Sequence, residues 1–332
     1  MNVYTKPFVS PHDLIHNHLT PKGIIFLAPY GVAEAEEYLS RINWYRFKSY
    51  LHPFLVTGTK KYIPGTTFSQ GVELYYFDCE LRELCNKYIL RIEVKAKTIL
   101  DQIITSFTND PFWYLCDDYF KDTENLPRLR QKIAGDLSYS RMEFAKYYKA
   151  NYISPKESWR TSPPFWLAME LMSFDTFVKF ANAVDSNKFM YSGKNKLGDA
   201  AKQMSAKNYR EMISWLLAIK GVQGPMIKEL RNRASHNART WNSNYRLPSG
   251  FVDNKNALVT DSYLTIPPVK KNKIYLILAT IKLITDNLIK QRNQFSTELQ
   301  ELLKKYHNHS YILSGMGFPA NWTSDPLWNP KN

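Results

Sequence analysis

The chain has 332 residues, of which 44% are hydrophobic and 22% charged, a mix typical of a folded globular protein and not of a disordered one. This length predicts one large domain or two closely packed ones. The formal net charge of +14 comes from 44 Lys and Arg against 30 Asp and Glu. Such an excess indicates a polyanionic partner, nucleic acid first and an anionic membrane surface second, although a basic solvated surface carries the same charge.

Neither secretion nor membrane insertion is expected from the sequence. The opening MNVYTKPFVS lacks the apolar segment of a signal peptide. The longest apolar run, at 274–284, is too short to span a bilayer and contains Lys282. Three cysteines without a CxxC pair are typical of reduced thiols. We therefore expect a cytoplasmic protein that makes no membrane contact through a spanning helix.

The pattern of apolar residues predicts helices along nearly the whole chain. Residues 33–51 (AEAEEYLSRINWYRFKSYL) start with acidic side chains, which suit a helix N-terminus, and His-Pro-Phe at 52–54 ends the helix. After a turn-rich stretch, residues 80–107 have the clearest helical period, with apolar side chains at steps of three and four from Leu81 to Ile103.

The middle of the chain gives weaker signals. Residues 111–140 have a mixed pattern, and a helix rich in Phe, Leu and Met is expected from Phe165, after a Ser-Pro-Pro sequence. Residues 187–207 are polar and basic, which indicates an exposed loop or a short helix. Residues 209–220 are apolar and predict another helix.

A break at GVQGP, 221–225, precedes a helix expected from Met226 to about Arg239, with the proline in its first turn. Residues 244–273 lack a helical period, and a loop of this length is usually functional or mobile. A last long helix is predicted at 274–306. The aromatic, proline-rich tail GMGFPANWTSDPLW should pack back on the body of the protein.

The stretch RNRASHNARTWN, which begins at Arg231, contains the residue types of a phosphate-cleaving site. Asn232 and His236 are four apart and stack on one helix face. Arg231 lies about 140° round the helix from His236, with a side chain long enough to reach the same pocket. Arginine binds a phosphate oxygen with paired donors, and histidine exchanges protons near neutral pH. The same pattern also fits a solvated face of a basic helix.

RNA carries its own nucleophile, the 2′-hydroxyl group, so a site of this kind needs no metal. One histidine per chain supplies only an acid or a base. A two-fold dimer would supply both, because it brings two copies of the motif together. Dimerisation is therefore part of this hypothesis.

Several longer segments resemble one bacterial family. RNRASHNARTWN is similar to the Arg–polar–His motif of HEPN-fold ribonucleases. AEEYLSRINWYRFKSYLHPF resembles the N-terminal signature of the Abi-like (AbiD/AbiF) abortive infection proteins, with Trp44 in place of the first of the usual tyrosines. Later segments are similar to the same family in the same order, and Asp175 stands where that family often has glycine: YYFDCELRELCNKYILRIEVKAK, PPFWLAMELMSFDTF and GFPANWTSDPLW. The resemblance covers most of the chain.

The resemblance implies an all-α, HEPN-like helical bundle with an N-terminal helical extension and long loops. It further implies a metal-independent endoribonuclease toxin of phage defence, without a cofactor, which a small non-coding RNA restrains in some relatives. By position, Arg231 and His236 correspond to the catalytic pair, and Asn232 supports them. Glu170 matches the acidic residue of the Trp-x-x-x-Glu segment, which either orients the arginine or only stabilises the fold.

Other basic and aromatic residues are candidates for the RNA path. Arg233 and Arg239 flank the motif and either bind phosphate or keep the helix soluble. Trp241 is the aromatic side chain that we expect nearest to RNA. Four lysines predict either a patch that binds the RNA backbone or a solvated loop: Lys194, Lys196, Lys202 and Lys207. We divide the chain at 155/156, into an N-terminal helical region and a C-terminal region with the motif, or treat it as one compact unit.

Three further signals favour an ordinary surface. His12, His16 and His18 are able to hold a metal, but we interpret them as polar residues of an N-terminal arm. The ExK sequence at 93–95 resembles part of a metal-dependent nuclease core, which needs a strand, and here it lies in a strong helical pattern. We interpret it as a solvated face. The pair Asp117-Asp118 indicates surface charge, and the sequence has no Gly-rich phosphate loop.

Two functions of different class follow from the sequence: an RNA-cleaving enzyme and a non-catalytic RNA-binding defence component. A structural dimer that senses a phage protein is a third. Both RNA functions predict an affinity that falls steeply with salt. Only the enzyme leaves RNA fragments with a 2′,3′-cyclic phosphate or a 3′-phosphate.

Overall fold

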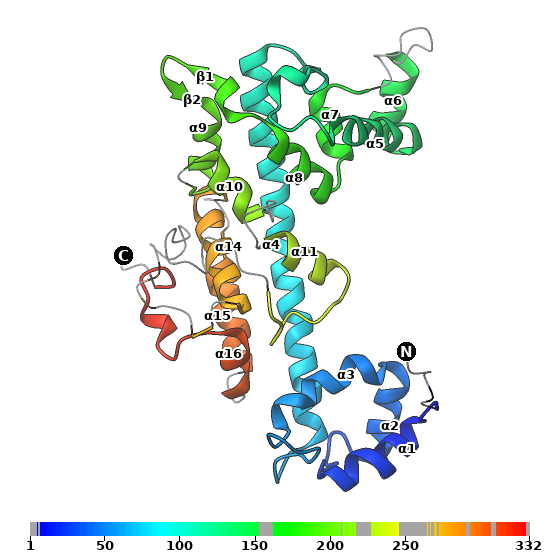
Figure 1. The fold of residues 1–332 in the computed structure, drawn as a ribbon. Helices are drawn as coiled ribbons and strands as arrows, with labels where there is room; N and C mark the ends of the chain where they lie inside the picture. Colours follow the sequence, from blue (N-terminus) through cyan, green and yellow to red (C-terminus); the bar gives the residue numbers. More distant parts are fainter. Residues whose placement is uncertain are drawn as a thin grey trace. The chain divides into compact units, whose positions relative to one another are not determined.

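The computed structural model describes residues 5, 7–152, 162–206, 208–216, 227–245, 264, 266, 269–270, 272–289, 293–306 and 310–329 (Figure 1). Over these residues the fold is predominantly helical, which confirms the predicted all-α class. Contacts along the chain define two compact units, residues 1–81 with 301–312 and residues 82–300 with 313–332. The boundary predicted at 155/156 falls inside the second of these units.

The first unit begins with a helical segment of changing pitch. It consists of α1 (Pro11–Asp13), the π-helical η1 (Leu14–Leu19) and the 3-10 turn η2 (Thr20–Lys22). Ser10 caps α1, because its hydroxyl accepts a hydrogen bond from the Asp13 N–H. The Thr20 N–H bonds to the carbonyl of Ile15, five residues back, which gives η1 its wider turn.

The helix predicted over 33–51 is in fact two helices, α2 (Val32–Arg41) and α3 (Trp44–Leu51). The break occurs because Asn43 is a helix N-cap: its side-chain oxygen accepts a hydrogen bond from the Tyr45 N–H at 2.8 Å. The 3-10 turn η3 (His52–Phe54) follows, as the proline predicts. The core of this unit is largely aromatic and includes Phe47, Tyr50, Phe54, Phe68 and Phe77.

Helix α4 (Phe68–Thr108) begins twelve residues before the predicted start at Glu80. Its predicted apolar stripe is buried from Leu81 to Ala96. Beyond that point Leu100 and Ile104 are buried, in place of Ile99 and Ile103, because the stripe continues in steps of four.

The second unit contains the C-terminal part of α4 and the helices that follow it: α5 (Leu126–Tyr139), α6 (Glu143–Asn151), α7 (Phe165–Leu171), α8 (Phe174–Ala183), α9 (Lys196–Gln203), α10 (Tyr209–Leu216) and α11 (Ile227–Ser235). Short 3-10 turns lie between some of them: η4 (Trp113–Leu115), η5 (Asp117–Tyr119) and η7 (Ser186–Phe189). The helix predicted from Phe165 divides at Ser173, whose hydroxyl accepts a hydrogen bond from the Thr176 N–H and caps α8.

The predicted basic stretch 187–207 contains a small hairpin and a helix. Strands β1 (Met190–Tyr191) and β2 (Lys194–Asn195) pair antiparallel. Their connection, Ser192-Gly193, has φ angles of 47° and 71°, and positive φ at both positions is typical of a tight two-residue hairpin turn. Asn195 then caps α9, since its side-chain oxygen accepts hydrogen bonds from the Leu197 and Gly198 N–H groups.

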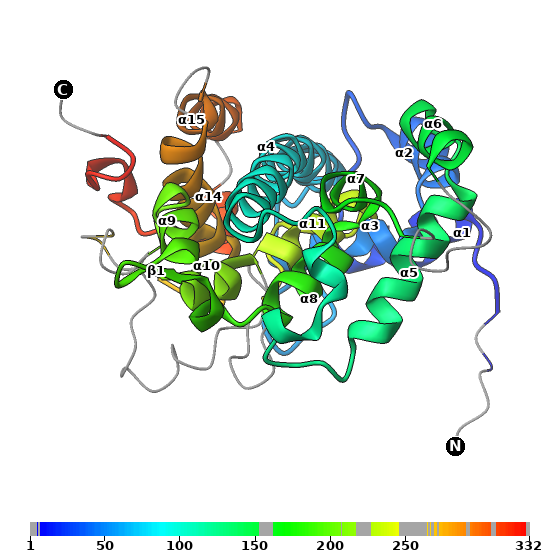
Figure 2. The same cartoon turned by 90° about the horizontal axis from the view of Figure 1, so that it is seen from above.

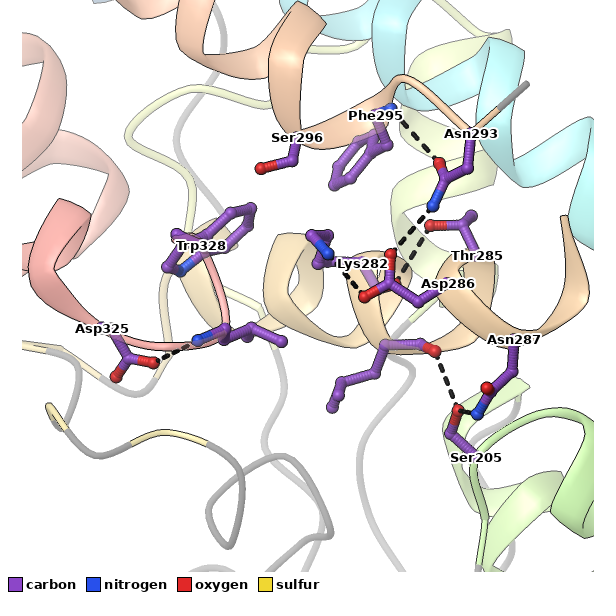
Figure 3. Close-up of polar contacts among 12 residues, drawn as sticks. Ser205, Lys282, Thr285, Asp286, Asn287, Asn293, Phe295, Ser296, Asp325 and Trp328 are labelled. Carbon is purple, nitrogen blue, oxygen red and sulfur yellow. Dashed lines mark hydrogen bonds and ion pairs between the residues drawn. The ribbon is translucent and has the colours of Figure 1, made fainter. Parts of the chain in front are cut away.

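The long helix predicted over 274–306 is divided into α14 (Ile274–Leu288) and α15 (Phe295–Lys305). Asn293 links the two helices through its side chain (Figure 3). Its amide nitrogen donates to Asp286 of α14, and its amide oxygen accepts from the Phe295 N–H at the start of α15. The chain ends with α16 (Ser310–Met316) and the 3-10 turn η8 (Trp322–Ser324). No described helix has both the length and the apolar character that crossing a bilayer requires.

The aromatic tail packs back on the second unit, as the sequence predicts. The Trp328 indole N–H donates to the Tyr275 hydroxyl at 3.1 Å, and the Phe318 ring centroid lies 4.4 Å from that of Tyr275. Asp325 is buried and accepts hydrogen bonds from the Leu327 and Ile266 N–H groups. The tail therefore covers one side of α14.

Candidate functional site on helix α11

Helix α11 carries the Arg–Asn–His motif and is seated by a narrow apolar stripe. Ile227, Leu230 and Ala234 are buried and recur at steps of three and four, so they form one side of the helix. Figures 1 and 2 both show α11 beside α4. A hydrogen bond of 3.4 Å between Ser235 and Asn86 joins the two helices.

The end of α11 places His236 at the protein surface. Asn237 has a φ of 52°, the left-handed conformation that commonly follows a helix. The Ala238 N–H bonds to the Arg233 carbonyl at 2.8 Å, and the Asn237 N–H bonds to the Ala234 carbonyl at 3.2 Å. This pair of bonds is a Schellman motif, which ends the helix at Ser235. The sequence had predicted a later end, near Arg239. His236 occupies the C-cap position with an exposed side chain.

The guanidinium of Arg231 faces α4 and a buried ion pair. The Arg231 NH2 nitrogen lies 3.9 Å from Oε2 of Glu93. Oε1 of Glu93 lies 3.0 Å from Nζ of Lys97, and both of those side chains are 11% exposed. Lys97 Nζ also donates to the Met172 carbonyl at 2.7 Å. Glu93 therefore stands between two cations and connects α4 to α11, while Lys97 connects α4 to the end of α7.

Two atoms at this contact have unused hydrogen-bonding capacity. Oε2 of Glu93 and Nε of Arg231 are buried, and neither has a hydrogen-bond partner among the described residues. A buried polar group without a partner costs about 1–3 kcal/mol. At 3.9 Å the pair is attracted by charge but does not form a short charge-assisted hydrogen bond. Glu93 thus positions Arg231 by charge attraction but leaves part of its hydrogen-bonding capacity unused.

The interpretation of 93–95 as a solvated face is wrong for Glu93, which is buried. Lys95 is exposed, so the two charges of the ExK sequence lie on different sides of α4 and do not converge on a metal. Sequence reasoning missed Glu93 as a site residue. The sequence did contain a signal for its burial. Glu93 lies next to Ile92 of the apolar stripe, and Lys97, one helical turn further on, follows Ala96 of the same stripe.

The structure brings together only part of the predicted trio. Asn232 and His236 lie on the same side of α11, and the His236 N–H bonds to the Asn232 carbonyl at 3.1 Å. Arg231 turns toward Glu93 instead. The predicted supporting residue, Glu170, has an exposed side chain on α7, whereas the carboxylate beside Arg231 belongs to Glu93.

The residues flanking the motif have structural contacts. Arg233 donates twice to Oε1 of Glu229, at 2.7 and 3.0 Å, and also to the Asn244 carbonyl at 3.2 Å. Its guanidinium lies 4.9 Å from the centroid of the Tyr245 ring. Arg233 thus holds the segment after α11 against the helix. These contacts leave it less available to phosphate than the sequence suggested.

The prediction that Trp241 stacks on RNA does not fit its environment, because Trp241 is fully buried. A Cβ atom placed on Gly315 of α16 would lie 2.9 Å from the indole, so the ring packs directly on that helix. Trp241 is a core residue that anchors the segment after α11. Arg239, close to it in sequence, is half-buried.

A basic cavity of about 630 Å³ opens beside the first turn of α11. Cationic side chains from three helices line it: Arg128 and Lys132 of α5, Lys179 of α8 and Lys228 of α11. Lys228 belongs to the same side of α11 as the motif, since Lys228, Asn232 and His236 recur every four residues. At about 1.5 Å per residue, this row extends for about 12 Å.

Asp175 partly neutralises this cavity. It forms ion pairs with Lys228 and with Lys179, the latter at 2.7 Å. Burial alone would raise the pKa of Asp175, but hydrogen bonds from Lys179 and Lys228 outweigh burial and hold the pKa below its usual value. The acidic residue at this position therefore ties α8 to α11.

Three of the four predicted lysines lie together around the hairpin and α9. Lys194, Lys196 and Lys202 line a cavity of about 780 Å³, which Arg210 of α10 also lines. Lys207, the fourth, lies outside the described residues. Two cavities rich in basic side chains thus lie among the described residues, and the sequence predicted lysines of the second one.

The second unit is therefore predominantly helical, with an Arg–Asn–His sequence at the exposed end of a short helix and basic cavities in the same unit. The family model described as Abi-like protein matches residues 37–242, and the chain belongs to this family. Membership indicates a part in abortive infection. Comparisons with curated proteins and with solved structures find no similar protein.

Proposed function

We propose that this Abi-like protein is a metal-independent endoribonuclease toxin of the HEPN type, which cleaves RNA by attack of the 2′-hydroxyl. His236 exchanges the proton of the 2′-hydroxyl or of the leaving 5′-oxygen. Arg231 holds a non-bridging phosphate oxygen. Asn232 orients the histidine or the RNA backbone. The exposed position of His236 at the end of α11 supports this proposal, because a substrate can reach the imidazole without any rearrangement.

The observation that carries the proposal is the row Lys228, Asn232 and His236 on one side of α11. It leads from a cavity whose lining includes four cationic side chains and two carboxylates, Asp122 and Asp175, to the exposed imidazole. A phosphate backbone held in such a cavity would lie along this row, since RNA affinity comes largely from phosphate contacts. The second basic cavity, with Lys194 and Lys196, offers a further binding surface for RNA.

Arg231 has to approach the same phosphate from the side of α4. Its loose contact with Glu93 favours this, because the 3.9 Å contact leaves N–H donors of the guanidinium unsatisfied and a phosphate offers acceptor oxygens for them. Glu93 acts as a positioning residue that keeps the guanidinium at the edge of α11. Each chain has one motif histidine, so the active form is a homodimer that brings two His236 side chains to one strand.

The substrate is RNA, and a small non-coding RNA bound at the same basic surface is the proposed inhibitor. The inhibitory RNA would compete with the substrate RNA for the same cationic side chains, and would thereby restrain the toxin. The protein acts in the cytoplasm and requires no cofactor.

The test is expression of the intact chain with sequencing of RNA ends, for wild type, His236→Ala and His18→Ala. His18 is also an exposed histidine but lies outside the motif, so its removal serves as the matched control. Wild type and His18→Ala should produce ends with a 2′,3′-cyclic phosphate and arrest growth. His236→Ala should fold normally and do neither. Cleavage by a folded His236→Ala variant would remove the proposed site.

Arg231→Ala should abolish cleavage in the same assay, and wild-type cleavage by purified protein should continue in EDTA. A loss of cutting in EDTA while circular dichroism shows an unchanged fold would contradict the metal-independent mechanism.

A non-catalytic RNA-binding component is the alternative. The observation that favours it is the orientation of Arg231 toward Glu93 and away from the side with His236. This alternative predicts salt-dependent RNA binding by wild type with intact RNA recovered from every variant.

A further inference from the structure

Two histidines and a glutamate of the first unit surround one point. His12 and His16 lie four residues apart on the α1–η1 segment, and their ring centroids are 4.3 Å apart. Glu36 of α2 faces both rings: its Oε1 atom is 2.8 Å from Nδ1 of His12 and 3.6 Å from Nε2 of His16. The three ligand atoms all lie within 4.8 Å of one another.

Two of these distances lie close to those in the coordination shell of a zinc-type ion. With metal–ligand bonds of about 2.0–2.1 Å, two ligand atoms of a tetrahedral shell lie about 3.3–3.4 Å apart. The contacts of 2.8 and 3.6 Å lie on either side of that value. The two histidine nitrogens lie within 4.8 Å of each other and would reach the ion by rotation of their exposed side chains. The imidazole side chains are 65% and 44% exposed, which gives an ion a path from solvent and leaves room for a water ligand.

The neighbouring carboxylates have other partners, whereas Glu36 faces the two rings. Asp13 accepts hydrogen bonds from Ser10 at 2.6 Å and from Asn17 at 3.2 Å. Glu37 pairs with Arg41 one turn along α2. The 2.8 Å contact between His12 and Glu36 is itself a hydrogen bond. A cation at this point would take electron pairs from the same Glu36 oxygen and from both ring nitrogens.

We propose that His12, His16 and Glu36 bind one transition-metal ion, with Zn²⁺ as the occupant. Imidazole nitrogens suit zinc, copper and nickel, while calcium and magnesium require oxygen ligands. The ion fastens the α1–η1 segment to α2, since two ligands come from one and the third from the other. This is a structural site, and none of its ligands belongs to the motif on α11.

The sequence alone showed only two of the three ligands of this site. Two histidines four residues apart are compatible with a metal, but the arm interpretation was equally compatible with them. Glu36 lies twenty residues beyond His16, within an acidic helix start, and only the fold places its carboxylate between the rings.

The experiment is calorimetric titration of ZnCl₂ into the full, tag-free chain, with two site variants and two matched controls. His12→Ala and Glu36→Gln remove one ligand each. His18→Ala removes an exposed histidine of the same segment, and Glu37→Gln removes the adjacent carboxylate. Circular dichroism of all metal-free proteins checks that each variant folds.

Wild type and both controls should bind one Zn²⁺ at this site and gain thermal stability from it. His12→Ala and Glu36→Gln should lose about tenfold or more in affinity and lose the thermal gain. Equal Zn²⁺ binding by the site variants and wild type would assign the metal to other side chains and overturn the proposal. Absence of binding by wild type would overturn it as well. Neither readout depends on RNA cleavage, so it leaves the proposed function untouched.

Discussion

The ion pair between Glu93 and Lys97 gives the sharpest prediction about stability. Both side chains are 11% exposed, and their charged atoms are 3.0 Å apart. Glu93→Gln keeps the shape of the side chain but leaves the Lys97 ammonium buried without a counter-charge. Removing one partner of a buried pair typically costs about 3–5 kcal/mol. Lys97 retains its bond to the Met172 carbonyl, so we expect a loss of about 3 kcal/mol, at the lower end of that range.

The opposite change should cost less. Lys97→Met leaves the Glu93 carboxylate buried, but Arg231 lies 3.9 Å away and can close on it. We expect a loss of about 1–2 kcal/mol, within the range for a partly compensated buried group. The double variant removes both charges, and replacing a buried pair by neutral groups is often close to neutral. It should therefore be more stable than Glu93→Gln alone.

The assay is urea unfolding of the three variants and wild type, followed by circular dichroism and by tryptophan fluorescence. Coincidence of the two signals tests whether a single free energy of unfolding is defined. A free energy of unfolding for Glu93→Gln within about 0.5 kcal/mol of wild type, the usual effect of a surface change, would refute the cost assigned to the buried Lys97 ammonium. A double variant that is no more stable than Glu93→Gln would refute it as well.

Two other predictions concern packing and pH. Gly315→Ala should cost about 1–3 kcal/mol in unfolding experiments, because its Cβ would meet the Trp241 ring at 2.9 Å. As a control, Gly198→Ala should be neutral or slightly stabilising, since the nearest atom to its Cβ is 3.9 Å away. Equal effects at the two glycines would contradict the packing argument. Asp175 has a lowered pKa in the folded protein, so its ion pairs stabilise the fold fully above the unfolded pKa of about 3.9. This stabilisation is lost as pH falls from there through the lowered folded pKa. Asp175→Asn should therefore lose less stability than wild type between neutral pH and pH 3 in thermal unfolding. Identical pH profiles would show that the ion pairs with Lys179 and Lys228 contribute nothing.

The apolar periodicity predicted most helices but not where they divide. Long helices were predicted at 33–51 and at 274–306, and both are interrupted. The interruptions depend on side chains that compete with the helix backbone for hydrogen bonds, Asn43 in the first and Asn293 in the second. A single polar residue inside an apolar pattern does not show from the sequence whether it caps a helix or faces solvent.

The candidate site was predicted in its residue types and not in its geometry. The sequence identifies Arg231, Asn232 and His236, and helical spacing alone places the last two on one side. The direction of Arg231 depends on Glu93, which lies far away in sequence. Trp241 looked suitable for stacking on a base, yet Gly315 provides the space that buries it.

By itself, the sequence determined the helical class, the family, the motif and the return of the aromatic tail, because these depend on local periodicity and on short patterns of residue types. Only the tertiary structure decided which charges are buried and which side chains meet. Examples are Glu93 between two cations, Asp175 between two lysines and Glu36 against two imidazoles. Each pairing joins separate turns or helices, and the energy of a charge depends on burial and partners that no local pattern encodes.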